Sequence, residues 1–150
     1  MRITAKVDYG VRTVAELAAT REGLSSGDLA DRQGVPFKFL VMIMKELSDA
    51  GLVVTDGDRH TLAVSPTTMK LGDVFRALEG PLANIRDQSL TSLSCPGAAE
   101  HLPEVWMAVR TSLRSVLDEV TFAELVSGQL PAPVQEMVGA YRDQGPRTLI

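Results

Sequence analysis

The segment from Gly51 to Val64, GLVVTDGDRHTLAV, constrains the fold of this chain more than any other. Two short apolar runs flank an Asp-Gly pair, and such a pair between apolar runs is the strongest short-range signal for a β-hairpin. The tip of the hairpin carries two aspartates, Asp56 and Asp58. The helices predicted around this hairpin then decide the fold class.

Three helices are predicted before the hairpin. Apolar residues recur at helical spacing over residues 4–20. Ser25 or Ser26 can cap a short second helix that ends at Gly34. A third helix is predicted over residues 36–51. Its inward stripe consists of Leu40, Ile43, Met44 and Leu47. Helix, short helix, glycine-containing turn, helix and hairpin is the order of a winged helix-turn-helix.

The second half of the chain is also predicted to be mainly helical. A fourth helix near residues 71–79 precedes a Ser-, Gly- and Pro-rich stretch at residues 81–102, which we interpret as a loop. A long helix is predicted from Pro103 to Val120; it spans about 27 Å, and the chain offers little else to pack on its apolar stripe. Because twofold dimers are the commonest oligomers, this stripe is predicted to meet the same helix of a second protomer. The stripe residues are Val105, Val109, Leu113, Val116 and Val120.

Two shorter helices complete the prediction. TFAEL, residues 121–125, contains a capping box of Thr121 and Glu124, and a last amphipathic helix is followed by a tail, QGPRTLI, that we expect to be frayed. The apolar residues of that helix are Val134, Met137, Val138 and Tyr141. The fold class is therefore mainly α with a small β-hairpin wing. The four parts are a winged helix-turn-helix domain (1–80), a sensor-type loop (81–102), a dimerisation helix with a short capping helix (103–127), and a C-terminal helix and tail (128–150).

The composition excludes several classes of protein. The net charge is −4, and residues 1–80 carry ten Lys and Arg against eleven Asp and Glu, so bulk charge does not argue for nucleic acid. The single cysteine excludes an internal disulfide framework. We expect a cytoplasmic protein without a membrane partner, because there is no secretory signal and no apolar run approaches about 20 residues. No P-loop, dinucleotide fingerprint, HExxH or nucleophile elbow occurs, which disfavours an enzyme.

Four segments occur in order over residues 1–127: MRITAKVDYGVRTVAELA, LADRQGVPFKFLVMIMKELSDAGLV, LGDVFRALEGPLA and VWMAVRTSLRSVLDEVTFAEL. Together they resemble the signature blocks of the Rrf2 family, bacterial transcription regulators of the IscR and NsrR type. The resemblance implies a homodimer of winged helix-turn-helix domains joined by long crossing helices. Such a dimer binds a pseudo-palindromic operator in double-stranded DNA and usually represses transcription.

The resemblance also suggests which residues contact DNA. Arg2, Thr4, Lys6, Tyr9 and Arg12 match the N-terminal motif of the family, and Lys38 and Phe39 match the start of its recognition helix. Lysines beside a helix N-terminus suit phosphate oxygens, although Lys6 and Lys38 also fit a solvated surface and Tyr9 and Phe39 equally fit core packing. The candidate DNA-binding residues are Arg2, Thr4, Lys6, Tyr9, Lys38, Phe39, Lys45 and Arg59.

The hairpin and the third helix depart from the family pattern. Family wings carry an Arg-Gly pair followed by a Gly-Gly pair, whereas this chain has TDGDRHTL. Arg59 and His60 are then the only candidate DNA-facing groups of the wing, and the hairpin could equally be a purely structural element. On the third helix, Val41 and Met42 face outward; they can contact thymine methyl groups but supply no hydrogen-bonded base readout.

The sensing residues of the family are also largely missing. Cluster-binding relatives place three cysteines before the long helix, and this chain has one, Cys95. His101 and Asp8 could add ligands, but we expect no iron–sulfur cluster, no other cofactor and no metal. Cys95 could be a redox-reactive thiol or an unreactive one. The effector could be a small molecule held near Trp106, which otherwise serves packing, or a partner protein. The alternative function is a protein-interaction or small-molecule-sensing module that has lost strong operator binding.

Overall fold

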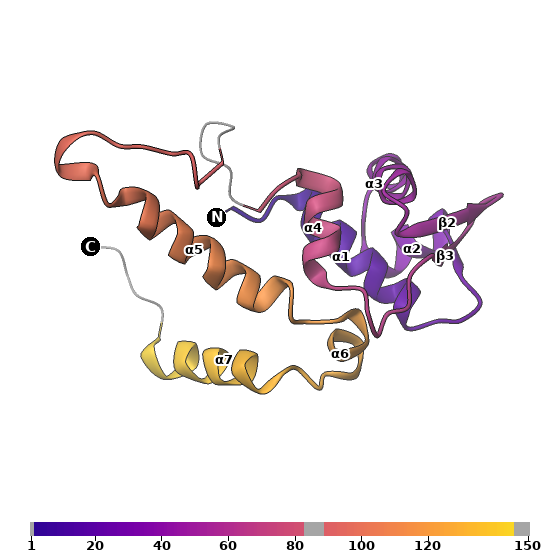
Figure 1. Ribbon diagram of the computed structural model, residues 1–150. Helices are drawn as coiled ribbons and strands as arrows, with labels where there is room; N and C mark the ends of the chain where they lie inside the picture. The colour runs from indigo at the N-terminus through magenta and orange to yellow at the C-terminus, as the bar shows by residue number, and fades with distance from the viewer. Residues whose placement is uncertain (1, 83–88, 146–150) are drawn as a thin grey trace.

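The structure, a computed structural model, describes residues 2–82 and 89–145. The described part is mainly helical with one small antiparallel sheet, which confirms the predicted fold class (Figure 1). The helices are α1 (Ala5–Ala18), α2 (Ser26–Gln33), α3 (Phe37–Asp49), α4 (Leu71–Glu79), α5 (Leu102–Leu117), α6 (Phe122–Ser127) and α7 (Ala132–Gln144), with a 3-10 turn η1 (Gly97–Ala99). The strands are β1 (Leu24–Ser25), β2 (Val53–Asp56) and β3 (Arg59–Leu62).

Local hydrogen bonds set the ends of α2 and α6 where the sequence predicts them. The hydroxyl of Ser25 accepts from the backbone N–H of Asp28 at 3.0 Å, and Gly34, with φ of 63°, ends α2 in the left-handed region. At α6 the capping box is complete: the N–H of Glu124 donates to the hydroxyl of Thr121, and the N–H of Thr121 donates to the Glu124 carboxylate at 2.8 Å.

The wing is a hairpin with a third strand that the sequence pattern did not predict. β2 and β3 are antiparallel and joined at Gly57 and Asp58, with Asp56 opposite Arg59. β1 pairs with β3, so that Leu24 lies opposite His60, and the strand order is β1-β3-β2. A strand of two residues has no periodicity of its own. The pairing ties the wing to the start of α2.

The core lies between α1, α2, α3, α4 and α6. The predicted inward stripe of α3, Leu40, Ile43, Met44 and Leu47, is buried as expected. Phe122 of α6 is fully buried in the same cluster. α1 and α4 approach closely at Gly10, where a Cβ would overlap the side chain of Leu78.

Helices α5 and α7 are less buried than the helices of the core. α5 and α7 extend away from this core (Figure 1), and no described helix has both the length and the apolar character needed to cross a bilayer. α5 ends at Leu117, not at Val120 as predicted. Val120 is 2% exposed and its carbonyl accepts from the N–H of Leu71, so it belongs to the protomer core and not to an exposed stripe. Residues 83–88 of the predicted loop and 146–150 of the predicted frayed tail lie outside the described residues.

Candidate nucleic-acid interface

The outward face of α3 lies beside the wing and is largely apolar. Phe37, Val41 and Met42 are exposed there, together with Lys38 and Lys45. A groove of about 670 Å³ runs between the N-terminus of α2, α3 and the wing. Its walls thus combine apolar side chains, the first residues of α2, and charges of both signs.

Internal partners hold several of the predicted phosphate-binding cations. Lys6 of α1 forms an ion pair with Glu46 of α3 at 3.2 Å, and Lys45 forms one with Asp49 at 2.6 Å. The hydrogen bond to Asp49 and the negative charge of that carboxylate raise the pKa of Lys45. Lys38 is exposed and has no hydrogen-bond or ion-pair partner within residues 2–82 and 89–145. Lys38 is therefore the α3 cation that is open to an external anion.

The predicted contact residues of the N-terminal motif join helices to one another. Thr4 caps α1, and its hydroxyl donates to Glu79 of α4 at 2.6 Å. The half-buried rings of Tyr9 and Phe39 meet edge to face, with centroids 5.6 Å apart. Arg12 lies over the Tyr9 ring, 5.4 Å from its centroid. Both aromatic rings therefore pack against neighbouring side chains, as the core-packing alternative predicts. Of the five motif residues, Arg2 is the exposed one.

The guanidinium of Arg59 turns back toward the protein. Its Nη1 donates to the carbonyl oxygens of Glu22 at 3.0 Å and Gly23 at 3.1 Å, both just before β1. Asp56 and Asp58 are exposed at the tip of the wing. The exposed charges of the tip are therefore of both signs: two carboxylates, and one arginine with one of its donor groups already used.

His60 does not face DNA as predicted; it is 4% exposed. Its Nε2 is 2.7 Å from the hydroxyl of Ser26 on α2, and its Nδ1 is 2.9 Å from the hydroxyl of Thr55 on β2. Burial lowers the pKa of His60, although the charge of Asp58 acts in the opposite direction. The ring is a neutral bridge between the wing and the helix-turn-helix. The burial of His60 depends on the pairing of β3 with β1, and the sequence pattern did not predict β1.

The candidate sensing residues do not converge. Cys95 is half-buried in the loop, while the His101 side chain is 78% exposed and lies 3.4 Å from Glu100. Asp8 pairs with Arg12 on α1. Within the described ranges, no three His, Cys, Asp or Glu side chains lie together in a way that could hold a metal ion. Trp106 is 37% exposed on α5.

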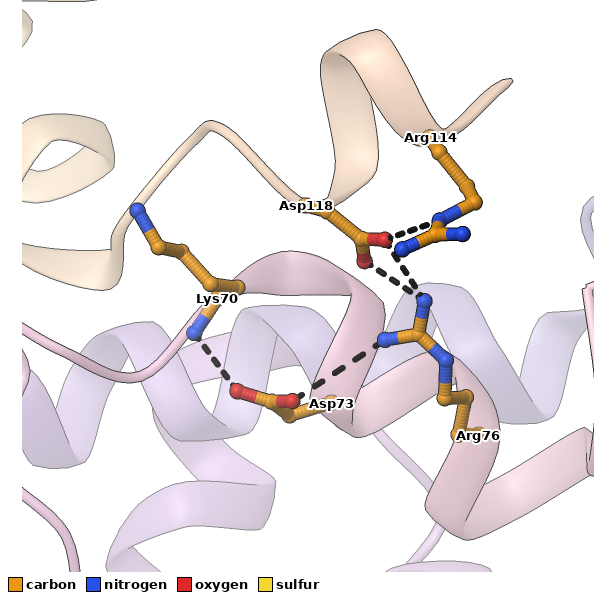
Figure 2. A network of polar contacts seen from close by, with 5 residues as sticks. All are labelled: Lys70, Asp73, Arg76, Arg114 and Asp118. Atoms are coloured by element: carbon orange, nitrogen blue, oxygen red, sulfur yellow. Dashed lines mark hydrogen bonds and ion pairs between the residues drawn. The ribbon is translucent and has the colours of Figure 1, made fainter. Parts of the chain in front are cut away.

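An ion-pair network that the sequence pattern does not reveal connects α4 to the end of α5 (Figure 2). Nη2 of Arg76 donates to both carboxylate oxygens of Asp118, at 2.7 and 2.8 Å, and Nε of Arg114 donates to the same carboxylate at 2.8 Å. Burial alone would raise the pKa of Asp118, but the hydrogen bonds and charges of the two arginines outweigh it and lower the pKa. A Cβ on Gly72 would overlap the carboxylate of Asp118 and lie 3.1 Å from the carbonyl oxygen of Leu117.

A helix-turn-helix with an exposed third helix and an adjacent wing defines the class of winged-helix DNA-binding regulators. The Rrf2 family, described as iron-dependent transcriptional regulators, matches residues 3–128. The chain belongs to this family. It is 40% identical to a putative HTH-type transcriptional regulator of Mycobacterium tuberculosis H37Rv, Rv1287, over 96% of this chain and 92% of the relative.

Solved structures of other Rrf2-type regulators agree with this assignment. The structure of CymR, the global cysteine regulator of B. subtilis, matches with a TM-score of 0.70 and 27% identity, over 85% of this chain and 97% of that one. The structure of IscR from T. potens matches with a TM-score of 0.67 and 28% identity, over 86% and 88% of the two chains.

The family description names iron, but the donor atoms of this chain do not fit an iron–sulfur cluster. Such a cluster is ordinarily held by three or four thiolates. The whole chain contains one cysteine, and its neighbours in the described structure do not complete a ligand set around it. No step of the proposed function therefore involves a cluster.

Proposed function

We propose that this chain acts as a homodimeric repressor that binds a pseudo-palindromic operator through α3 and the wing, with an effector other than an iron–sulfur cluster. The observation that carries the proposal is the exposed face of α3 beside the wing, where Lys38 has no internal partner in the described structure. Val41 and Met42 on the same face can contact thymine methyl groups. A helix of this kind in the major groove is the docking mode of the class.

The charges around α3 support weak electrostatic binding. Glu46 and Asp49 already neutralise Lys6 and Lys45, and the wing presents Asp56 and Asp58. Each phosphate that a protein neutralises adds about −0.9 to the slope of log K against log salt concentration. A small number of unpaired cations therefore predicts a shallow salt dependence, with base contacts and shape supplying a larger share of the affinity.

The apolar surface of α5 supports the dimer. Val105 is 53% exposed and Val109, four residues later on the same face, is 42% exposed; Leu113 and Val116 continue this face and are half-buried. Monomeric proteins seldom leave such a row of large apolar side chains open along a helix. A second copy of α5 crossing the first would cover this row, and a twofold dimer has one α3 helix for each half-site of a palindromic operator.

Fluorescence anisotropy with DNA from upstream of the gene, measured over a salt series, tests the proposal. Lys38→Ala should weaken binding and flatten the salt slope by about 0.9 for each phosphate that is no longer neutralised, or about 1.8 when both protomers contribute. The double variant Asp56→Asn and Asp58→Asn should tighten binding to all sequences alike. Arg142→Ala on α7, which is remote from α3 in Figure 1, serves as the matched control for removal of one positive charge.

Two outcomes would count against the proposal. Absence of salt-dependent binding to any upstream fragment, by the unmodified chain and the double variant alike, would favour the interaction module. An equal effect of Lys38→Ala and Arg142→Ala would show that net charge, and not the position of Lys38, governs binding.

A further inference from the structure

A cavity of about 500 Å³ lies where α4, the segment Gly80–Leu82 and α5 meet. Three arginines line it: Arg76 from α4, and Arg110 and Arg114 from α5. The carboxylate in its lining is that of Asp118. Cavities of this size accommodate small metabolites. The lining therefore has an excess of positive charge.

The three arginines differ in their hydrogen-bond and ion-pair partners. Arg76 and Arg114 share the carboxylate of Asp118 (Figure 2), and Nη1 of Arg76 also lies 4.0 Å from the Asp73 carboxylate. Nε of Arg110 is buried and has no hydrogen-bond partner in the described part of the chain. A buried donor on a charged group without an acceptor is costly, so such a group calls for an external acceptor. Arg110 thus carries the unmatched charge of the cavity.

The geometry of α5 keeps this cavity apart from the proposed dimer surface. Arg110, Arg114 and Asp118 follow one another at four-residue spacing, so they lie along one face of the helix. Val105 and Val109 are exposed on a different face. The cavity therefore does not use the face of α5 that carries Val105 and Val109.

We propose that this cavity binds a small anion with a carboxylate or phosphate group, held by Arg110 together with Arg114 and Arg76. Guanidinium groups offer paired N–H donors that match both kinds of anion. Asp118 occupies two of the three arginines in the structure, so it acts as an internal competitor that a bound anion displaces in part.

The position of the cavity suggests what such an anion would do. Arg76 belongs to the winged-helix domain, whereas Arg110 and Arg114 belong to α5. An anion that draws Arg76 or Arg114 away from Asp118 changes the contact between these two parts. The anion is then the effector of the regulator, a step that rests on the proposed function.

Isothermal titration of the full chain without DNA tests the site, with inorganic phosphate and malonate as probes and sodium chloride at equal ionic strength as the reference. Arg110→Gln should weaken binding about tenfold or more, because it removes a charge-assisted donor without breaking a hydrogen bond of Nε within the described residues. Asp118→Asn should strengthen binding several-fold by removing the competitor. Arg142→Gln on α7, the matched control, should stay within twofold of the unmodified chain.

The outcomes distinguish a phosphate-bearing ligand from a carboxylate and show whether the site exists. Binding of phosphate alone assigns a phosphate-bearing ligand, and binding of malonate alone assigns a carboxylate. The site is refuted when neither probe binds better than chloride, or when Arg110→Gln binds as the unmodified chain does. A thermal melt of each variant, followed by circular dichroism, shows whether the fold is intact. When Asp118→Asn does not fold, the comparison of Arg110→Gln with Arg142→Gln still decides.

A second measurement addresses the effector. The probe that binds should change the dissociation constant of the DNA complex for the unmodified chain but not for Arg110→Gln. Anion binding without any change in DNA affinity upholds the site and refutes its effector role. Anion binding by a chain that binds no DNA upholds the site and refutes the proposed function.

Discussion

Helices α1 to α4 and α6 on one side, and α5 and α7 on the other, carry similar apolar stripes, but only the first group covers most of its stripes within the protomer. Leu40, Ile43 and Leu47 of α3 are fully buried, whereas Val105 of α5 is 53% exposed and Tyr141 of α7 is 70% exposed. Periodicity therefore predicts that a helix has an apolar face, but not which chain covers it. The first region is a covered core, whereas the second leaves large apolar side chains exposed, which the proposed dimer would cover in part.

The largest expected effect tests the completeness of the first region. Phe122→Ala should lower the free energy of unfolding by about 3–5 kcal/mol, because it leaves a cavity in the core, and the decrease should not depend on protein concentration. Tyr141→Ala, the control in the open region, should change it by no more than about 0.5 kcal/mol. Urea denaturation at two protein concentrations measures both, and equal decreases would contradict the distinction between the regions.

The next effect tests the partner of the second region. Val109→Asp should weaken self-association by about 3 kcal/mol or more, over a hundredfold, since it buries an unpaired charge between the two α5 helices. Light scattering at micromolar concentration should then give a monomeric mass with the helical content retained. Thr111→Asp, which adds the same charge to an exposed position of α5, should remain dimeric. A monomeric unmodified chain would overturn this prediction.

The two histidines of the chain compare a buried polar group with an exposed one. His60→Phe should cost about 1–3 kcal/mol because it leaves the hydroxyls of Ser26 and Thr55 without their partner. His101→Phe, at a position whose side chain is 78% exposed, should cost much less.

The pH dependence of the free energy of unfolding also distinguishes buried His60 from exposed His101. Because the pKa of His60 is lowered in the folded state, the unfolded chain takes up a proton at higher pH than the folded chain does. The free energy of unfolding should therefore fall as the pH drops through 6.5, the ordinary value for histidine. Urea melts between about pH 7.5 and pH 5.5 should show a smaller fall for His60→Phe than for His101→Phe. Identical slopes for the two variants would show that His60 is not held neutral.

The smallest effect concerns the point where the two regions join. Thr121→Ala removes the N-cap of α6 and should lower the free energy of unfolding by about 1 kcal/mol. Thr121→Ser keeps the hydroxyl and should restore most of this stability, as measured by thermal denaturation. A serine variant no better than the alanine variant would show that the methyl group, and not the cap, matters here.

Much of the fold follows from local signals in the sequence. The caps at Ser25 and Thr121, the stop at Gly34 and the stripe of α3 all involve residues a few positions apart, so spacing alone identifies them. The hairpin around Gly57 has the same local character. The order of these elements predicts a winged helix-turn-helix, and the resemblance adds the Rrf2 family of transcription regulators; the comparisons confirm both.

The candidate site was harder to predict because its details depend on contacts between distant residues. β1 is recognisable only by its pairing with β3, and that pairing buries His60 and draws Arg59 toward the carbonyl groups before β1. The ion pair of Arg76 with Asp118 spans 42 positions, a separation at which helical periodicity carries no information. Charge alone also could not show that, among the residues the structure describes, Lys45 has an ion-pair partner and Lys38 has none.

The close approach at Gly72 has a geometric consequence for a twofold assembly. A Cβ at this position would overlap the carboxylate of Asp118 and lie 3.1 Å from the carbonyl oxygen of Leu117, so a side chain here would displace Asp118 or shift the end of α5. In the proposed dimer each protomer contains one such contact, and symmetry doubles any rotation at it when the two α3 helices are compared. Half-sites one turn of B-DNA apart, about 34 Å, tolerate little misalignment. A side chain at position 72 that rotates α5 relative to α4 would therefore misalign the two α3 helices by twice the rotation within one protomer.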